Sequence, residues 1–474
     1  MTTLLLRIEL LHFLRDRRVV LFGIAVLLIV CTAALDGWAR AAAARADRAA
    51  ASTVDREIWV EQGPNNPHGA AHFARYAFRS VSPLAAFDPG LSDYGGAAVW
   101  MEAHYQNPAA LRRSEDMGTE APWPAVDPAW AIRVLGGLFL AVLLFPAIAG
   151  ERERGTLRAL AAQGVSASAI FAGKAGAAFV PVALFGGGLL CALLFSGANV
   201  FDVPLEPLRV LALALAYCLG LGAFAALVLA LSARAADRGS ALAVAGGAWV
   251  VLALALPGAA GSFATAVHPT PTPREFNTRL QLEAQSPFWV GDAREGAIAA
   301  YERQVLERYG ADSFEALGFD RDAMELQAHE TFANAVYDRI YGDLEDIHQA
   351  QDALDRGIAL LSPLHLLQRI SAGLAGSDLL AQTRFAQDAE AHRRRMIEQL
   401  NVHMMEEAGG TGFAYAADRS LWAAIEDFDG SPPSLAEVTR HYALEWLALL
   451  LWATGALALA RREIRRALRD AVVA

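Results

Sequence analysis

The segment WAIRVLGGLFLAVLLFPAIAG, residues 130–150, is followed directly by ERERGTLRALAAQGVS, residues 151–166. Arg133 is the only charged residue in the first segment. Every backbone polar group inside lipid must be hydrogen-bonded within its own helix, so about 20 such apolar residues predict a membrane-spanning helix. The second segment is charged and contains Gly155 and Gly164, which predicts a short helix between two breaks at the end of the span.

Similar apolar stretches recur along the chain and set the fold class. The predicted spans are residues 19–35, 130–150, 173–195, 208–231, 240–256 and 442–460, so that residues 173–256 hold the third to fifth spans. The composition is 55% hydrophobic and 19% charged, which is too apolar for an ordinary soluble domain and too charged for a chain buried wholly in lipid. We therefore predict a mainly α-helical, polytopic membrane protein with six transmembrane helices and two domains outside the cytoplasm.

Arginine and lysine residues in the short loops predict the orientation, because they resist translocation while long domains cross largely regardless of charge. With six spans, every basic cluster falls on one side, at residues 7–18, 151–174, 234–238 and 461–469. We therefore expect a multi-pass protein of the bacterial inner membrane with both termini in the cytosol. Residues 1–18 predict either an amphipathic helix on the inner membrane surface or an ordinary basic lead-in, and residues 461–474 a basic cytosolic tail.

The first periplasmic domain is expected at residues 36–129. It opens with an Ala- and Arg-rich run, residues 40–56, which predicts a helical continuation of the first span. The remainder is rich in proline, glycine and aromatic residues, and turn signals such as Asp88-Pro89-Gly90 and Ala121-Pro122-Trp123-Pro124 recur in it. Short strands or irregular loops are therefore expected there.

The second periplasmic domain, residues 257–441, is strongly acidic and is expected to be helical. Apolar residues at helical spacing predict one long helix over residues 320–361, stopped by Pro363, and a second that is capped by Ser377 and runs to about residue 407. This domain accounts for much of the net charge of −11. An acidic chain of this kind disfavours nucleic acid as a partner.

Residues 151–166 carry the functional argument. Thr156 is expected to cap the short helix with its hydroxyl, Gly164 to end it in a left-handed conformation, and Ser166 to cap the helix that enters the third span. A short helix held between two spans can transmit a push. Its charged residues offer ionic contacts to a soluble partner.

This loop resembles the permeases of ABC-2 type transporters, whose signature after the second span is a glutamate, three residues, and then Gly-Thr-Leu. The matching residues are Glu151, Gly155, Thr156 and Leu157, and Lys174 lies where such permeases often have a lysine. The resemblance implies that residues 151–172 form a cytosolic coupling helix that docks on an ATPase subunit. It also implies two ATPase copies, which bind ATP and Mg²⁺, and pairing with a second permease, identical or homologous.

The coupling residues implied in this way are Glu151, Arg152, Glu153, Gly155, Thr156, Leu157 and Lys174. Motifs in both outer segments resemble a branch of these permeases that has two large periplasmic inserts and is mostly uncharacterised. They include Asn66-Pro67-His68, Glu102-Ala103-His104, Ser362-Pro363-Leu364 and Arg393-Arg394-Arg395. The resemblance therefore indicates the architecture of the chain more than its substrate.

Sequence motifs for catalysis by this chain are lacking. There is no GxxxxGK[ST] loop to hold a nucleotide phosphate, no HExxH and no GxSxG. We therefore expect a non-catalytic subunit that binds no cofactor, with nucleotide hydrolysis performed by another chain.

Three histidines of the first outer segment are weak candidates for a metal site. His68 and His72 are four residues apart, which on a helix would place both on one face, and His104 would complete a site. The preceding Asn65-Asn66-Pro67 is a turn signal, so helical geometry is not assured. Structural or interface roles are favoured, and no metal site is predicted.

Ionisable residues, which usually mark a translocation path, are almost missing from the predicted spans. Arg133 and Glu445 lie near the outer ends, where they are expected to snorkel toward water. The leading hypothesis is a permease whose outer lobes move when an ATPase closes, with a hydrophobic or amphiphilic cargo. The alternatives are a mechanotransmission or assembly device that acts on a periplasmic partner, for example in metalloenzyme maturation, and a static membrane anchor without an ATPase.

Overall fold

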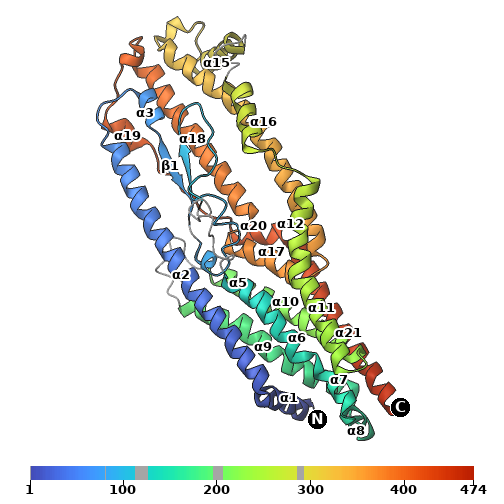
Figure 1. Ribbon diagram of the computed structural model, residues 1–474. Helices are drawn as coiled ribbons and strands as arrows, with labels where there is room; N and C mark the ends of the chain where they lie inside the picture. The colour runs from blue at the N-terminus through green and yellow to red at the C-terminus, as the bar shows by residue number, and fades with distance from the viewer. Residues whose placement is uncertain (1, 81, 113–125, 196–205, 286–292, 474) are drawn as a thin grey trace.

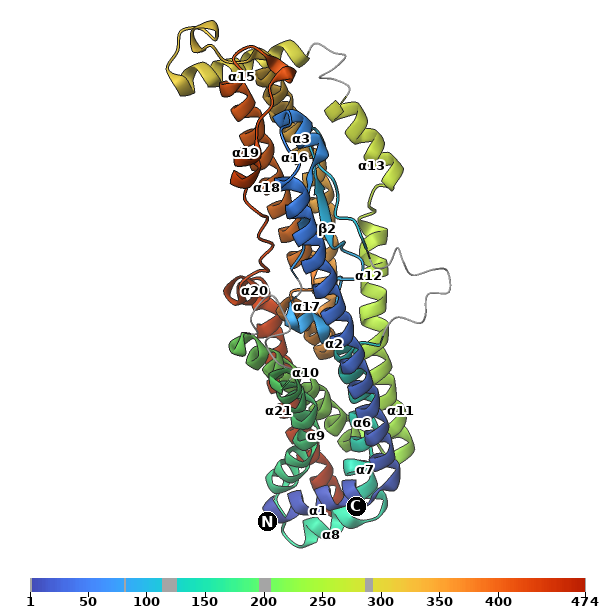
Figure 2. The same ribbon diagram turned by 90° about the vertical axis from the view of Figure 1, so that its left-hand side faces the viewer.

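The computed structural model describes residues 2–80, 82–112, 126–195, 206–285 and 293–473. A helical bundle carries both chain termini at one end, called here the terminal end, and an elongated lobe extends from the other end (Figures 1 and 2). Six helices of the described part are long and apolar enough to cross a membrane. These run over Arg17–Val60, Pro128–Glu153, Ala167–Gly186, Pro207–Arg234, Arg238–Val267 and Ala443–Val472. The prediction of a mainly α-helical, polytopic membrane protein is confirmed.

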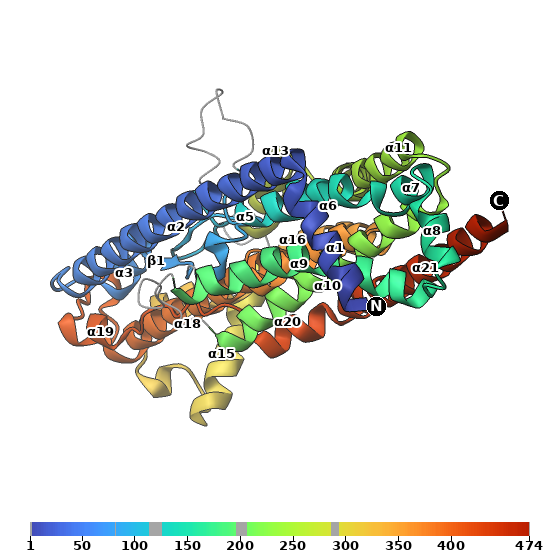
Figure 3. The ribbon, with the colours of Figure 1, turned by 90° about the horizontal axis from the view of Figure 1, so that it is seen from below.

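Several of the bundle helices are interrupted by π-helical or short segments. The elements are α1 (Thr2–Arg15), α2 (Arg17–Val60), α5 (Pro128–Trp130), η2 (Ala131–Gly136), α6 (Gly137–Leu144), α7 (Pro146–Glu153), α8 (Thr156–Ala162), α9 (Ala167–Phe195), α10 (Pro207–Arg234), α11 (Arg238–Trp249), η4 (Val250–Ala255), α12 (Leu256–Val267) and α21 (Ala443–Val473). Helix α10 is central, because it packs against α6, α9, α17 and α21. Figure 3 shows the bundle from the terminal end.

The helix of the fifth span is longer than predicted. The sequence indicates a span over residues 240–256, but α11, η4 and α12 form one continuous helix to Val267. Pro257 suggested an end, because proline lacks an N–H and clashes with the preceding helical turn. The π-helical segment η4 comes directly before Pro257, and its wider hydrogen-bond spacing lets the helix continue.

The first outer segment is partly helical. Its elements are α3 (Pro67–Phe73), β1 (Arg75–Phe78), η1 (Pro83–Ala86) and β2 (Ala98–Met101). The two strands pair antiparallel, with Arg75 opposite Met101. The mixed character agrees with the prediction. The turn signal before His68 leads directly into a helix: Gly63 has a φ of 77°, and Asn66 caps α3. The predicted turn at Ala121-Pro122-Trp123-Pro124 lies outside the described residues.

The second outer segment is helical and forms most of the lobe. Its elements are α13 (Pro273–Leu280), η5 (Gln281–Gln285), α15 (Ala293–Tyr309), η6 (Glu315–Leu317), α16 (Arg321–Ala359), α17 (Pro363–Ala375), α18 (Leu379–Glu407), η7 (Gly412–Ala414), α19 (Arg419–Ala424) and α20 (Leu435–His441). Helices α16 and α18 match the two predicted long helices. The cap of α18 differs: the Asp378 side chain accepts a hydrogen bond from the Ala381 N–H at 3.0 Å, while the Ser377 hydroxyl bonds to the carbonyl of Ala372.

The lobe and the bundle meet at buried charges, which corrects the expectation that Arg133 and Glu445 snorkel. The Glu445 side chain is fully buried, and its Oε1 accepts from Arg356 Nε at 2.8 Å and from Arg369 Nε at 3.2 Å. Arg133 is also buried and donates to the carbonyl of Ala253 at 3.4 Å. Both charges therefore find partners on other helices instead of reaching water.

Candidate functional site

Two glycines define the short helix α8 at the terminal end. Helix α7 ends at Glu153, and Gly155 then adopts a φ of 71° and forms the N-cap of α8. Gly164 has a φ of 73° just after the helix. Both conformations are left-handed and favour glycine, because a side chain would crowd the backbone. The predicted roles of Gly164 and of Ser166, whose Oγ accepts from the Ala169 N–H at 3.2 Å, are confirmed.

Thr156 does not cap α8 with its hydroxyl, contrary to the prediction. It is the first helical residue, and its Oγ1 turns back to donate to the carbonyl of Glu151 at 3.1 Å. The same hydroxyl contacts the Glu151 carboxylate. The reason is the tight turn at Gly155, which brings the start of α8 over the last turn of α7. Thr156 therefore fixes the angle between these helices.

Lys174 joins three helices through a buried ionic cluster. Its Nζ lies 2.7 Å from Glu9 Oε1 on α1 and 3.4 Å from Glu151 Oε1 on α7, while Lys174 itself lies on α9. All three side chains are buried. Charges removed from water are tolerated only when they are paired, so each depends on the others.

Glu9 is a member of this site that the sequence interpretation missed. The amphipathic interpretation of residues 1–18 rests on the helical spacing of Leu4, Ile8 and Leu11, with Glu9 away from that apolar face. The structure exposes those three residues and turns Leu5, Glu9 and Phe13 toward the bundle. The available signal was that Glu9 lies four residues after Leu5 and four residues before Phe13, which places its carboxylate in the middle of an apolar helix face.

Arg152 and Glu153 attach the end of α7 to the connection between α10 and α11. Arg152 Nη2 donates to the carbonyl of Ala233 at 2.7 Å, and its Nη1 contacts the carbonyl of Ala235. A cation at the end of α10 satisfies carbonyls that have no partner within the helix. Glu153 Oε1 accepts from the Arg238 N–H at the start of α11 at 2.7 Å.

Leu157 is the apolar anchor of α8. It is buried in a cluster with Ile148, Val165, Ile170, Ala233, Ile464 and Ala467. This cluster joins α8 to α7, α9, α10 and α21. The opposite face of α8 is exposed and includes Arg158, Ala159 and Ala162. A cavity of about 870 Å³ lies beside it, between α1 and α7, and Glu9, Glu151 and Lys174 contribute to its walls.

The structure therefore brings the seven predicted coupling residues and Glu9 into one region. The apolar cluster around Leu157 connects α8 to α7, α9, α10 and α21. Helix α1 is connected indirectly, because Glu9 pairs with Lys174, Lys174 with Glu151, and Glu151 with Thr156 on α8. The arrangement is a set of packing and ionic contacts between helices. What it can do is transmit a displacement of α8 to the bundle.

The three candidate histidines also lie together, in the lobe. His68 and His72 are on α3, and their Nε2 atoms are 3.1 Å apart. A potential ligand atom from each of His68, His72 and His104 lies within 4.8 Å of the others. The turn signal before His68 left helical geometry open, and the structure shows a helix that starts at Asn66 and Pro67.

Comparison with known proteins gives one match. A sequence profile described as "ABC-2 family transporter protein" matches residues 3–382. The matched range begins in α1, includes all of α8 and ends in the first turn of α18. No curated protein and no solved structure matches the chain.

Proposed function

Because the chain belongs to the ABC-2 family of transporter proteins, we propose that it is the membrane-spanning permease subunit of an ATP-driven ABC transporter. A separate ATPase subunit, present in two copies, binds ATP and Mg²⁺. A second permease, identical or homologous, completes the complex. The protein lies in a bacterial inner membrane with both termini and α8 in the cytosol and the lobe in the periplasm.

The observation that carries this proposal is the contrast between the two faces of α8. One face is fixed by Leu157 in a buried apolar cluster, and the other exposes Arg158, Ala159 and Ala162. At the edge of this exposed face, Arg158 Nε donates to the carbonyl of Ala471 at 3.4 Å. The exposed face is the docking surface for the ATPase. When the ATPases close on ATP, α8 is pushed and the buried face transmits the movement.

Two routes lead from α8 into the bundle. The first passes through Glu151, Lys174 and Glu9 to α1, and from there to α2. The second passes through Arg152 to the end of α10, the central helix. Both routes use buried ionic or charge-assisted hydrogen bonds, whose loss leaves charges unpaired. A push on α8 therefore reaches the helices that extend toward the lobe.

A second candidate function is mechanotransmission to a periplasmic partner without solute export. The observation that favours it is α2, which runs unbroken from Arg17 at the terminal end to Val60 in the lobe (Figure 1). Its far end is fixed in the lobe by Trp59, whose ring lies 5.8 Å from that of Trp422. Export of a hydrophobic or amphiphilic cargo is the alternative outcome of the same movement.

Site-specific photo-crosslinking tests the docking surface. A photoreactive amino acid is introduced at Ala162 on α8, with Glu295 on α15 of the lobe as the control; both positions are exposed. The tagged chain is irradiated in native membranes, and its adducts are identified by mass spectrometry. We expect an ABC ATPase at Ala162 and none at Glu295. An ATPase adduct at Glu295, or none at Ala162, contradicts the proposal.

Gly155 provides the functional test. Gly155→Ile places a β-branched residue at a φ of 71°, where it is strained, whereas Gly155→Asn is tolerated in this conformation. The space around Gly155 is open, so the bulk itself causes no clash. We expect Gly155→Ile, like Glu151→Lys, to insert into the membrane but to uncouple ATP turnover from activity, and Gly155→Asn to remain coupled. Full coupling in both Gly155→Ile and Glu151→Lys would refute the mechanism.

A further inference from the structure

Helix α3 presents two imidazoles side by side. The Asn66 side chain accepts from the N–H groups of His68 and Gly69 at 3.0 and 3.2 Å, and Pro67 occupies the first helical position. These are standard features of a helix start, so the short helix is well defined. His68 and His72 are then one turn apart, with their Nε2 atoms 3.1 Å apart.

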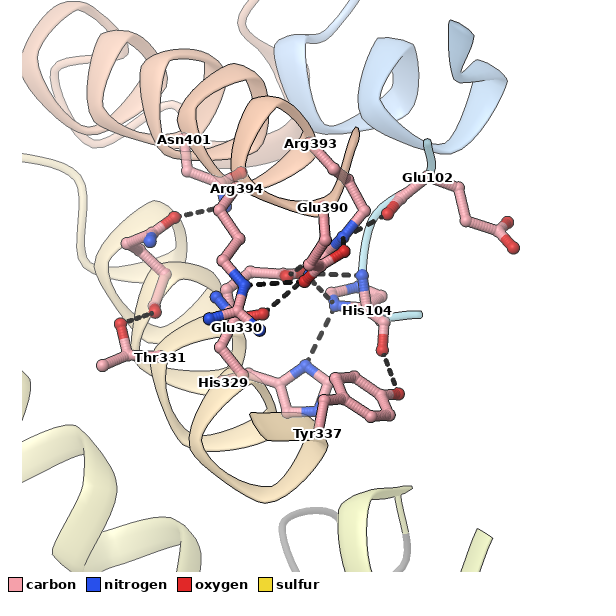
Figure 4. Close-up of polar contacts among 12 residues, drawn as sticks. Glu102, His104, His329, Glu330, Thr331, Tyr337, Glu390, Arg393, Arg394 and Asn401 are labelled. Carbon is pink, nitrogen blue, oxygen red and sulfur yellow. Dashed lines mark hydrogen bonds and ion pairs between the residues drawn. The ribbon is translucent and has the colours of Figure 1, made fainter. Parts of the chain in front are cut away.

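His104 is held against this pair by an unusual backbone conformation. Its φ is 68°, a left-handed value that is uncommon for a residue other than glycine and often marks a functional position. The His104 N–H donates to Glu330 Oε1 at 2.6 Å, and its carbonyl accepts from the Tyr337 hydroxyl at 2.7 Å (Figure 4). The ring centroid of His104 is 5.0 Å from that of His68 and 5.0 Å from that of His72.

Glu330 orients the His104 ring. Its Oε1 lies 2.7 Å from His104 Nδ1, and its Oε2 accepts from Arg393 Nη1 at 3.3 Å. Glu330 is itself buried, so its carboxylate depends on these contacts with His104 and Arg393. The contacts of Glu330 with the backbone N–H and the Nδ1 of His104 fix the direction of the imidazole ring.

This carboxylate–histidine pair is the arrangement that protein metal sites use to fix a ligand's tautomer and direction. His68 is buried, and its Nε2 faces that of His72. A neutral imidazole is the form that binds a metal ion.

We propose that His68, His72 and His104 bind one divalent transition-metal ion of the zinc class, with Glu330 as the residue that positions His104. Two nitrogens at about 2.0–2.1 Å from a tetrahedral ion lie about 3.3 Å apart, close to the 3.1 Å between His68 and His72. Three imidazoles suit Zn²⁺, Cu²⁺ or Ni²⁺ rather than Mg²⁺ or Ca²⁺. His72 is exposed, so an ion bound beside it would be accessible from solvent.

A second set of three residues, His104, His329 and Glu330, also has its potential ligand atoms within 4.8 Å. It is less suited to a metal, because both oxygens of Glu330 already accept hydrogen bonds and His104 Nδ1 faces them. His329 Nδ1 lies 2.9 Å from His104 Nδ1, and the His329 side chain is fully buried. His329 and Glu330 therefore hold His104 in place and are not themselves metal ligands.

The site connects the two outer segments. His68, His72 and His104 belong to the first segment, whereas Glu330 lies on α16 and Arg393 on α18 of the second. A bound ion would thus stabilise the packing of α3 and the loop after β2 on these two long helices. This inference does not depend on the proposed role of α8.

Metal titration of the full-length protein in detergent tests the inference. The chain is stripped with a chelator, and Co²⁺ is added as a spectroscopic probe, followed by Zn²⁺ in competition with a chromophoric chelator. His72→Ala is the test variant, because His72 is exposed and its removal leaves the lobe core intact. His348→Ala, on α16 and away from the cluster, is the matched control.

We expect one ion per chain, with the visible absorption of low-coordinate Co²⁺, in the wild-type protein and in His348→Ala. His72→Ala should bind Co²⁺ and Zn²⁺ at least about tenfold more weakly, because one of three protein ligands is lost. Wild-type protein that binds no ion would overturn the assignment. So would binding by His72→Ala that equals the wild type, or a loss in His348→Ala that equals the loss in His72→Ala.

Discussion

Replacement of Lys174 by methionine tests the buried cluster at the terminal end. The substitution keeps the apolar part of the side chain and removes the cation that lies 2.7 Å from Glu9 and 3.4 Å from Glu151. Breaking a buried ion pair from one side costs about 3–5 kcal/mol, because the remaining charge is left without compensation. We expect about 3 kcal/mol, since Glu151 keeps a hydrogen bond from Thr156 while Glu9 loses its cation.

The assay is the free energy of unfolding in detergent micelles titrated with denaturant, for Lys174→Met, Glu9→Gln and the double variant. Glu9→Gln should lower the free energy of unfolding by less than Lys174→Met, because Lys174 remains paired with Glu151. The double variant should cost less than the sum of the two, with a coupling energy of about 0.5–3 kcal/mol. The exposed pair of Arg384 and Asp388, 2.7 Å apart, is the control, and Arg384→Met should cost about 0.5 kcal/mol or less. A cost for Lys174→Met no larger than for Arg384→Met would refute the reasoning.

Three further predictions concern packing, ionisation and capping. Gly173→Leu should detach α1 from α9, because a Cβ there would lie 2.7 Å from Leu5 Cβ; increased proteolysis before residue 17 measures this, and an unchanged digest would contradict it. Burial raises the pKa of Asp88 to about 7. The folded protein therefore binds more protons than the unfolded chain between about pH 4 and 7, so stability should fall as pH rises through this window. Asp88→Asn should flatten a plot of melting temperature against pH there, and an unchanged slope would show that Asp88 is not the cause. Asp378→Ala should lower the free energy of unfolding by about 1 kcal/mol, because it removes a helix cap. Ser377→Ala should lower it by less; a larger loss for Ser377→Ala would show that Ser377 is the capping residue.

The sequence predicted the spans and the long lobe helices well, because both depend on local patterns. A span needs an uninterrupted apolar run, and α16 and α18 show apolar residues at helical spacing. The Gly155 and Gly164 breaks are equally local. These signals were sufficient for the fold class and for the position of α8.

Pairings between distant residues could not be read in this way. Lys174 and Glu9 are 165 residues apart, and His104 and Glu330 are 226 residues apart. The sequence suggested that Glu445 extends toward water, because its partners Arg356 and Arg369 lie on other helices and cannot be recognised from its own segment. No spacing rule within one segment indicates such partners.

Asn66 and Pro67 show a different limit. Asparagine and proline are frequent both in turns and at helix starts, so the same two residues are compatible with both interpretations. The structure decides for a helix start, and with it changes His68 and His72 from scattered loop residues into neighbours. The candidate metal site depended on this single local choice.

Helix α2 runs from the terminal end of the bundle into the lobe, so a small rotation at the terminal end would become a larger movement in the lobe. At about 1.5 Å per residue, its 44 residues extend for about 66 Å. Used as a lever with its pivot near α1, it would sweep Trp59 through about 6 Å for a tilt of roughly 5°. That amplitude is about the height of one α-helical turn, enough to change which side chains face each other at the tip.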